Sequence, residues 1–507
     1  MSSPLPHPLL TLAVTYPERP FVNELSAREL LSEVTEAASA LMSALSAPSL
    51  SSTPLSFELN ESLKSLKSSQ GSLLGARVGL QGAYDERWVC WALALNALGA
   101  TLAPLKPEAT TRELEVTRER LELSAVFEVE TLEALLSELS EPPEPWLDHL
   151  LAREEARWGW ERPLFVLSTS GTTGDPKPVT LTTRALTLSA FGSMVRLGHT
   201  PNDRWLACLP LHHVGGLSML TRALLQQTSL TLCAPQPSAL LAHLLTGEVS
   251  LCSLTPTLLS ALLDELEPLA ACSPEALEPM RARLRVLLIG GASTPAPLWA
   301  RARALELPVR LTWGMSEAAS QVCTQLEPAP PGGALPPLPF QRLSLNEEGC
   351  LELTSPTTER GVHLTSDLGA LDERGWVSVL GRSDEVIISG GVNIHPREVE
   401  ERLCEHPPVG EVAVVGEADE RWGQRLVAHL TLKGALSPPS DEVLRAWCGE
   451  RLSRYKCPKR FVWHSALPRD ALGKLRKREL TSNAPSKPSS LSPLLPISPI
   501  TQAERDS

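Results

Sequence analysis

A stretch rich in glycine, serine and threonine surrounds one lysine in LSTSGTTGDPKPVTL, residues 167–181. Hydroxyl groups, and backbone N–H groups that glycine lets converge on a common hollow, are donors suited to a phosphate. The candidate donors are Thr169, Ser170, Gly171, Thr172, Thr173, Gly174 and Lys177. Because the lysine lies between two prolines, the segment is not a Gly-Lys-Ser/Thr P-loop. The sequence predicts a different phosphate-binding loop, and the alternative is a flexible surface linker.

Two further segments place polar side chains directly after apolar strands. LACLPLHHVGG (206–216) carries His212 and His213. The alternative interpretation is that these histidines only pack in the core or cap a helix. LTWGMSEAAS (311–320) carries Trp313, Gly314, Ser316 and Glu317. A carboxylate beside bound phosphates requires a cation between them, and a hard oxygen ligand suits Mg²⁺. We therefore expect Glu317 to bind magnesium.

The C-terminal third adds another acid and two more cations. The segment 364–400 contains Asp367, a candidate acceptor for ribose hydroxyls, and Arg382. LPRDALGKLRKREL (467–480) presents Lys474 directly after Gly473, on a predicted turn. The alternatives are surface hairpin turns for the first segment and a solvent-exposed lysine for the second.

The elements that must position these residues follow a mixed α/β pattern. Residues 76–105 indicate strand, turn, helix and strand, and the alternation continues from 163 to about 380. We expect a large N-terminal domain of doubly wound α/β sheets with a β subdomain (1–380), a hinge linker (381–385) and a small, mobile α+β C-terminal domain (386–480). The Ser/Pro-rich end (481–507) is typical of a disordered tail.

Bulk composition narrows the function class. The chain has 507 residues, 42% of them apolar, and a net charge of −13, which argues against a nucleic-acid partner. Residues 451–480 hold ten Lys/Arg against two acids and favour a small polyanion there. Ten scattered cysteines and the absence of a signal peptide or a long apolar run predict a soluble cytoplasmic protein with no membrane insertion. Homo-oligomer formation stays open.

From about Pro17 to Leu480, these motifs in this order resemble the adenylate-forming superfamily of acyl-CoA synthetases, amino-acid adenylation domains and luciferases. The resemblance implies an ATP-dependent acid–thiol ligase that first adenylates a carboxylate and then transfers the acyl group to CoA. It implies Mg²⁺ as cofactor, and ATP, CoA and a small carboxylate as partners. Three departures from the family pattern are Pro178, Thr-Ser-Asp at 365–367 in place of Thr-Gly-Asp, and His212 where an aromatic ring is common.

The same resemblance assigns roles residue by residue. It places residues 168–179 around the ATP phosphates and Ser316 against the phosphate. It implies Glu317 as magnesium ligand, Lys474 as the catalytic lysine of adenylation and His213 beside the acyl carboxylate. The remaining assignments are Gly291, Ala292, Trp313 and Gly314 to the nucleotide pocket, Asp367 and Arg382 to the ribose, Asp384 to the hinge, and Gly390 and Gly391 to the CoA channel.

The identity of the acid depends on Arg222, nine residues beyond His213 on a predicted apolar helix. Within the superfamily this segment looks most like the ligases that activate o-succinylbenzoate for menaquinone biosynthesis. An arginine there is suited to bind a second carboxylate, or alternatively to snorkel to the surface. Other aromatic or fatty acids, a stand-alone amino-acid adenylating enzyme and a degenerate nucleotide-binding regulator are the alternative functions.

Overall fold

The structure is a computed structural model, and it describes residues 13, 15, 18–46, 62–64, 66, 73–138, 159–169, 177–434, 436–470 and 473–481. The chain forms two compact units. The N-terminal unit comprises 1–294, 298–342 and 354–363, and the C-terminal unit comprises 295–297, 343–353 and 364–507. This division groups residues 343–353 and 364–380 with the C-terminal segment. The hinge at 381–385 stays a prediction.

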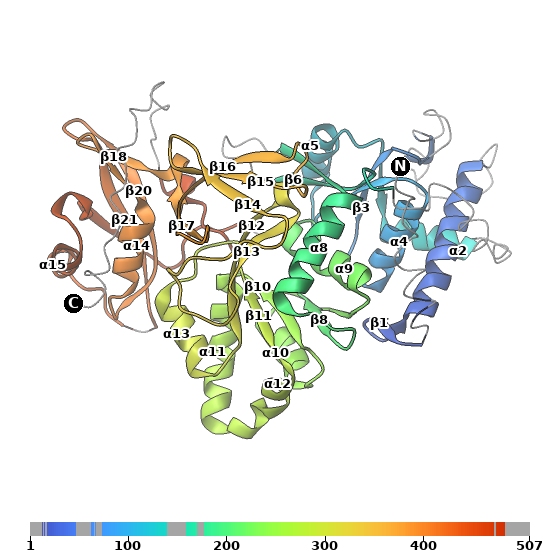
Figure 1. Cartoon of the computed structure of the whole chain (residues 1–507), viewed down its shortest axis with the longest axis horizontal. Helices are drawn as coiled ribbons and strands as arrows, with labels where there is room; N and C mark the ends of the chain where they lie inside the picture. The colour runs from blue at the N-terminus through green and yellow to red at the C-terminus, as the bar shows by residue number, and fades with distance from the viewer. Residues whose placement is uncertain are drawn as a thin grey trace. The chain divides into compact units, whose positions relative to one another are not determined.

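An eight-stranded sheet forms the larger part of the N-terminal unit, in the order β13-β12-β11-β10-β8-β9-β1-β2 (Figure 1). Its central strands are parallel, and helices occur between successive strands along the chain. The strands are β1 (Pro20–Val22), β2 (Leu25–Ser26), β8 (Arg204–Ala207), β9 (Ser229–Leu232), β10 (Leu251–Leu254), β11 (Val286–Ile289), β12 (Val309–Met315) and β13 (Ser320–Thr324). The helices are α9 (Val214–Gln226), α10 (Pro237–Leu245), α11 (Pro256–Cys272), α12 (Glu278–Arg283) and α13 (Ala296–Ala304).

A second sheet in this unit has the order β5-β3-β4-β6-β7, with only the β6–β7 pair antiparallel. Its strands are β3 (Arg77–Gln81), β4 (Thr101–Pro104), β5 (Ala125–Glu128), β6 (Pro163–Thr169) and β7 (Lys177–Thr182). Its helices are α2 (Ala27–Ser46), α4 (Glu86–Ala97), α5 (Thr111–Leu121), α6 (Val129–Glu138) and α8 (Thr183–Leu197). Asp85 caps α4 by accepting from the Trp88 N–H, so the strand–turn–helix–strand prediction for 76–105 is confirmed.

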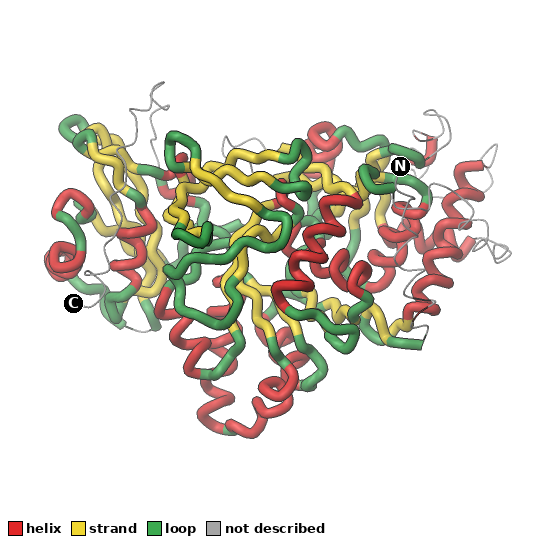
Figure 2. Tube along the Cα trace, viewed as in Figure 1, coloured by secondary structure: helices red, strands yellow, loops and turns green. Residues whose placement is uncertain are grey.

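The C-terminal part of the chain builds two further sheets, whose strands are drawn yellow in Figure 2. Their strand orders are β14-β15-β16-β17 and β19-β18-β21-β20, with β22 paired to β21. The first contains β14 (Arg342–Leu345), β15 (Cys350–Thr354), β16 (Val362–Leu371) and β17 (Val377–Arg382). The second contains β18 (Ile387–Ser389), β19 (Val392–Ile394), β20 (Val409–Asp419), β21 (Gly423–Leu432) and β22 (Arg460–His464), with α14 (Pro396–Cys404) and α15 (Asp441–Arg451). The mixed α/β fold class is thereby confirmed.

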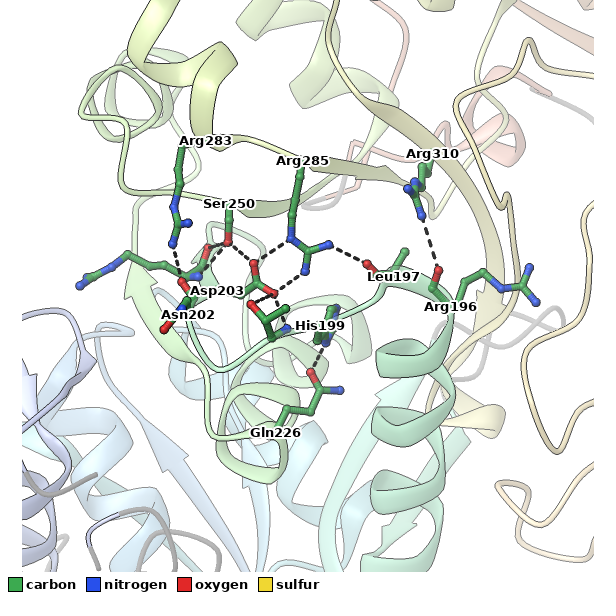
Figure 3. Close-up of polar contacts among 12 residues, drawn as sticks. Arg196, Leu197, His199, Asn202, Asp203, Gln226, Ser250, Arg283, Arg285 and Arg310 are labelled. Carbon is green, nitrogen blue, oxygen red and sulfur yellow. Dashed lines mark hydrogen bonds and ion pairs between the residues drawn. The ribbon is translucent and has the colours of Figure 1, made fainter. Parts of the chain in front are cut away.

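An ion pair between the buried Asp203 and the partly exposed Arg285 joins the starts of three parallel strands of the large sheet, together with Ser250 (Figure 3). Asp203, Ser250 and Arg285 directly precede β8, β10 and β11. The Asp203 carboxylate accepts from Arg285 Nε and Ser250 Oγ, each at 2.8 Å. Burial raises the pKa of Asp203, but these bonds and one from the Thr200 N–H outweigh it, so the pKa lies below its usual value. The pair therefore holds the strands in register at the edge opposite their carboxyl ends.

Candidate functional site

The hydroxyl-rich loop begins and ends on neighbouring strands. Thr169 ends β6 and Lys177 begins β7, and the two residues face each other in the antiparallel register. The Thr169 hydroxyl donates to the Lys177 carbonyl oxygen at 3.2 Å, and the Lys177 side chain is exposed. The intervening predicted residues, Ser170, Gly171, Thr172, Thr173 and Gly174, lie outside the described residues.

The predicted nucleotide-pocket residues lie at the carboxyl ends of two adjacent parallel strands. Gly291 and Ala292 follow β11, and Trp313 and Gly314 belong to the end of β12. A Cβ atom at Gly314 would lie 1.8 Å from the carbonyl oxygen of Ser320, so no other residue fits there. The carboxyl edge of an open α/β sheet is where such folds bind ligands.

Ser316 and Glu317 form a short 3₁₀ turn, η3 (Ser316–Ala318), directly after β12. The turn ends in two non-glycine residues with left-handed φ angles, Ala319 at 55° and Ser320 at 105°. Such angles are uncommon for residues with a Cβ atom and cluster at functional sites. The described residues contain no group of three or more His, Cys, Asp or Glu side chains that could hold a metal ion.

The two histidines lie between β8 and α9, where His213 is the N-cap residue of the helix. Their rings are tilted by 47° with centroids 4.2 Å apart. The Tyr84 hydroxyl lies 2.6 Å from His212 Nδ1 and donates to the Leu105 carbonyl oxygen at 2.8 Å. Burial, followed by the nearby charges of His213 and Lys106, lowers the pKa of His212 to about 3. His212 is therefore neutral at physiological pH.

Arg222 is a buried cation of the N-terminal unit. It lies on α9 with 2% of its surface exposed, which contradicts the alternative that it snorkels to solvent. One terminal nitrogen donates to Ser320 Oγ at 3.1 Å, and Ser320 Oγ donates to Ser218 Oγ at 3.2 Å. The guanidinium carbon lies 5.8 Å from the centroid of the Trp205 ring.

Nothing in the described part of the chain neutralises this guanidinium. No carboxylate there forms an ion pair with Arg222, and its Nε is buried without a hydrogen-bond partner. Burial lowers the pKa of Arg222 from its ordinary value to about 9, so the side chain is still charged at neutral pH. A buried cation without a counter-ion is costly and attracts an anionic ligand.

In the C-terminal unit, Asp367, Arg382 and Asp384 form one cluster. Asp367 on β16 faces Arg382 on β17 in the sheet register. Arg382 Nε lies 2.9 Å from Asp384 Oδ1, and its NH1 lies 3.4 Å from Asp367 Oδ1. Burial lowers the pKa of Arg382, but the two carboxylates outweigh it and raise the pKa. The proposed ribose residues and hinge residue are thus in direct contact.

Gly390 and Gly391 form the two-residue turn between β18 and β19. Their φ angles of 59° and 80° are those that such a tight hairpin requires. The Gly390 N–H donates to the Trp422 carbonyl oxygen at 2.8 Å, and a Cβ atom at 390 would lie 2.9 Å from the Trp422 ring. Both glycines are exposed, and so is the Trp422 side chain.

Lys474 lies on the predicted turn. Its N–H donates to Asp470 Oδ1 at 2.9 Å, and its carbonyl oxygen accepts from the Asp470 N–H at 2.9 Å. The Lys474 residue is exposed, and no ion pair of its ammonium occurs among the described residues.

The structure groups the predicted residues into two sets, each within one unit. The first comprises Thr169, Lys177, His213, Arg222, Gly291, Ala292, Trp313, Gly314, Ser316 and Glu317. The second comprises Asp367, Arg382, Asp384, Gly390, Gly391 and Lys474. The sequence analysis did not single out Tyr84, Ser218 and Ser320. Tyr84 lies three residues beyond the end of β3, and Ser320, within the quoted segment 311–320, is the first residue of β13. The available signal was therefore only a polar residue close to a strand end.

No helix in the described ranges is both long and apolar enough to cross a membrane.

Comparisons with known proteins agree with this geometry. A 2-succinylbenzoate–CoA ligase of Bacillus cereus is 36% identical over 349 residues, which cover 63% of this chain and 70% of the relative. The same-named enzyme of Bacillus mycoides matches to the same extent. The structure of o-succinylbenzoate CoA synthetase from Bacillus subtilis with its acyl-adenylate intermediate has a TM-score of 0.75 at 27% identity, covering 96% of this chain and 100% of that one. Its complex with ATP and magnesium has a TM-score of 0.76 at 27% identity, covering 94% and 100%.

Two family models match the chain. The AMP-binding enzyme model matches residues 64–361, which is more than half of the chain, and the model of the AMP-binding enzyme C-terminal domain matches residues 398–474. The first match contains the hydroxyl-rich loop and the end of β12, and the second ends at Lys474. The chain therefore belongs to the AMP-binding enzyme family.

Proposed function

We propose that the protein is an ATP-dependent acyl-CoA ligase that converts 2-succinylbenzoate into 2-succinylbenzoyl-CoA in menaquinone biosynthesis. The observation that carries the choice of acid is Arg222, a buried cation without a carboxylate partner among the described residues. Family membership and relatives named 2-succinylbenzoate–CoA ligase support the reaction class. Another aromatic or fatty acid, or an amino acid, is the alternative substrate.

The nucleotide would bind at the carboxyl edge of the sheets. We assign the phosphates to Thr169, Lys177 and Ser316, together with the predicted loop residues between the first two. Trp313, Gly314, Gly291 and Ala292 would line the base pocket, and Asp367 and Arg382 would bind the ribose. The support is that Gly291, Ala292, Trp313, Gly314 and Ser316 follow or end adjacent parallel strands, whereas Asp367 and Arg382 face each other on β16 and β17.

The first half-reaction activates the carboxylate, because a free carboxylate could transfer its acyl group only by releasing oxide, a poor leaving group. A substrate carboxylate oxygen attacks the α-phosphorus of ATP, the bond to the β-phosphate oxygen breaks, and pyrophosphate leaves. Negative charge builds on the α-phosphoryl oxygens, where a preorganised cation stabilises the transition state. Lys474 is suited to this role because its ammonium is exposed and is not held in an ion pair among the described residues.

Magnesium fits the donor set of the chain. Mg²⁺ commonly binds through one or two protein carboxylates together with substrate phosphates. Glu317, on the turn after β12, supplies one such carboxylate, and the described residues offer no larger acidic cluster. When bound, the ion would neutralise phosphate charge, and Glu317 would hold it at the sheet edge beside Ser316.

The second half-reaction transfers the acyl group. The CoA thiol attacks the acyl carbonyl carbon, the thiol proton leaves, and the bond to the phosphate oxygen breaks to release AMP. The Gly390–Gly391 turn lacks side chains on an exposed face, as a channel for a narrow pantetheine arm requires. Rotation of the C-terminal domain about Asp384 would withdraw Lys474 from the reaction pocket and bring the Gly390–Gly391 turn to it. The exposed cations of the basic run 451–480 would receive the CoA phosphates.

Arg222 would select the acid. 2-Succinylbenzoate carries two carboxylates, and the one that is not activated would pair with the guanidinium through its unpartnered Nε. His213, which caps α9, would lie beside the carboxylate that is activated. A monocarboxylic acid would leave the buried charge unsatisfied, which disfavours its binding.

A cytoplasmic location is part of the proposal. All ten cysteines are free thiols, and most are buried. A hydrogen bond with Cys252, followed by burial, raises the pKa of Cys208, and burial raises the pKa of Cys323, which makes these thiols unreactive. Free thiols in this number are typical of proteins in a reducing compartment.

A panel of acids tests the proposal. The purified protein is incubated with ATP, Mg²⁺, CoA and one acid, and both pyrophosphate and the CoA thioester are measured. We expect the highest kcat/KM with 2-succinylbenzoate, a lower value with benzoate and octanoate, and no turnover with amino acids. Efficient thioester formation only from a monocarboxylic acid would reject the proposed substrate but keep the ligase. No pyrophosphate release with any acid would reject the ligase itself.

A further inference from the structure

The turn that presents Lys474 is attached to the body of the C-terminal unit on both sides. Before the turn, Arg469 binds Glu411 of β20, with 2.5 Å between NH2 and Oε1. After the turn, Lys477 begins the short helix η6 (Lys477–Leu480) and binds two carboxylates. Its Nζ lies 2.7 Å from Glu385 Oε2 and 2.9 Å from Glu400 Oε1.

The second attachment is buried. The side chains of Lys477 and Glu400 are only 18% and 16% exposed. Glu400 on α14 also accepts from the Val414 N–H of β20 at 2.8 Å, so it is fixed from two directions. Burial lowers the pKa of Lys477, but Glu400 and Glu385 outweigh it and raise the pKa, so this lysine stays charged in the folded protein. Charged pairs in such surroundings hold one geometry, unlike exposed pairs.

Glu385 connects this network to the predicted hinge. It is the last residue of the turn η4 (Ser383–Glu385) and directly follows Asp384, which binds Arg382. Lys477 therefore links the segment next to the hinge with α14 and with the turn that carries Lys474. The backbone bond from the Arg476 N–H to the Pro468 carbonyl oxygen, at 2.9 Å, closes the turn itself.

We propose that Lys477 is a positioning residue for adenylation, which acts through Glu385 and Glu400. This inference rests on the proposed function, because it assumes that Lys474 stabilises the charge on the α-phosphate. The two ion pairs make the Lys474 turn and the hinge-proximal segment move as one rigid body. When the unit rotates, the Lys474 turn keeps its position relative to the rest of the unit. The Lys474 ammonium therefore reaches the same point in the reaction pocket each time.

Three variants and a rescue test the proposal in both half-reactions. Lys477→Met removes the charge but keeps an apolar stem of similar length. Glu385→Gln cuts the connection to the hinge segment and leaves the Lys477–Glu400 pair intact, so it preserves folding. Arg402→Met is the matched control, because Arg402 on α14 is about half exposed and its ion pair in the described part of the chain is with Glu405 at the surface. Lys477→Arg tests rescue by a conservative cation.

We expect Lys477→Met and Glu385→Gln to lower kcat for pyrophosphate release by about 10- to 100-fold, the effect of a misplacement near 1 Å. The KM for ATP should stay unchanged, and so should thioester formation from supplied acyl-adenylate. Lys477→Arg should recover most of the rate, and Arg402→Met should match the parent protein. Retained thioester formation also shows that each variant is folded.

Two results would overturn the inference while the proposed function stands. One is a parent-like adenylation rate in both Lys477→Met and Glu385→Gln when Lys474→Ala is inactive. The other is an equal loss in the two half-reactions, which indicates general destabilisation. If Lys477→Met does not fold, the Glu385→Gln rates decide alone. A parent protein that releases no pyrophosphate with any acid rejects the function and the inference together.

Discussion

Replacing Arg222 by methionine should stabilise the protein and impair its selectivity for dicarboxylates. Burial alone lowers the pKa of this arginine from its ordinary value to about 9. At ~1.4 kcal/mol per pH unit, that difference of about 3.5 units corresponds to ~5 kcal/mol against the charged form. Methionine fills a similar volume without a charge, but it loses the bond to Ser320 and the contact with Trp205. We expect the free energy of unfolding to rise by about 1–4 kcal/mol.

The effect on activity should have the opposite sign. A hydrogen bond to a charged group contributes ~1.5–3 kcal/mol, so losing the contact should lower kcat/KM for 2-succinylbenzoate by about 10- to 150-fold. The kcat/KM for a monocarboxylic analogue should stay the same or rise. Urea denaturation measures the first effect, and steady-state thioester formation measures the second.

Arg301→Met is the matched comparison. Arg301 on α13 binds Asp264 and Glu267, and these carboxylates raise its pKa despite partial burial. This variant should lose stability, because it removes the ion pairs of Arg301 with both acids, and it should keep the acid selectivity of the parent. If Arg222→Met were destabilised as Arg301→Met is, the charge of Arg222 would already be compensated in the free protein. If both acids lost activity equally, Arg222 would not contact the substrate.

Two further predictions concern catalysis and pH. Lys474→Ala should lower the rate of ATP–pyrophosphate exchange by at least ~10²- to 10³-fold and leave thioester formation from supplied acyl-adenylate largely intact; equal losses would refute separate conformations for the two steps. Burial lowers the pKa of His199 from 6.5 to about 4, so its contribution to stability is complete above pH 6.5 and is lost as the pH falls toward 4. The difference of about 2.5 units corresponds to ~3 kcal/mol, and His199→Gln should remove that part of the decline in urea denaturation between about pH 7 and pH 4. An identical decline in both proteins would show that His199 is not the group that titrates.

Local patterns in the sequence were sufficient to predict the positions of the site residues on their elements. Apolar runs followed by small or polar residues marked the ends of β11 and β12, and the structure has Gly291 and Trp313 there. The apolar helix around Arg222 was also recognisable, since its pattern requires no knowledge of other segments. Predictions of this kind depend on neighbours along the chain, which the sequence displays directly.

Contacts between distant segments could not be predicted in the same way. Tyr84 binds His212 across 128 residues, and Arg222 binds Ser320 across 98. These pairs depend on the strand order, in which β8 lies between β10 and β9. Its predecessor along the chain, β7, belongs to the other sheet. The absence of a carboxylate beside Arg222, among the residues that the structure describes, is likewise a property of the folded core. The sequence shows a charged residue on an apolar helix. Only the 2% exposure of Arg222 in the structure shows that this charge is shielded from water.

The basic run near the end of the chain shows most clearly what folding adds. Lys474 and Lys477 are three residues apart and chemically identical, and their sequence context suggests a single exposed cationic stretch. In the folded protein Lys477 is enclosed by Glu385 and Glu400, whereas Lys474 is exposed. A cation held by two carboxylates has little remaining capacity to stabilise a developing phosphate charge, but it can fix a backbone. A cation outside such pairs can stabilise the phosphate only if its backbone is already fixed. We therefore propose that the two lysines have complementary tasks, and that the ion pairs of Lys477 let Lys474 act at a defined point.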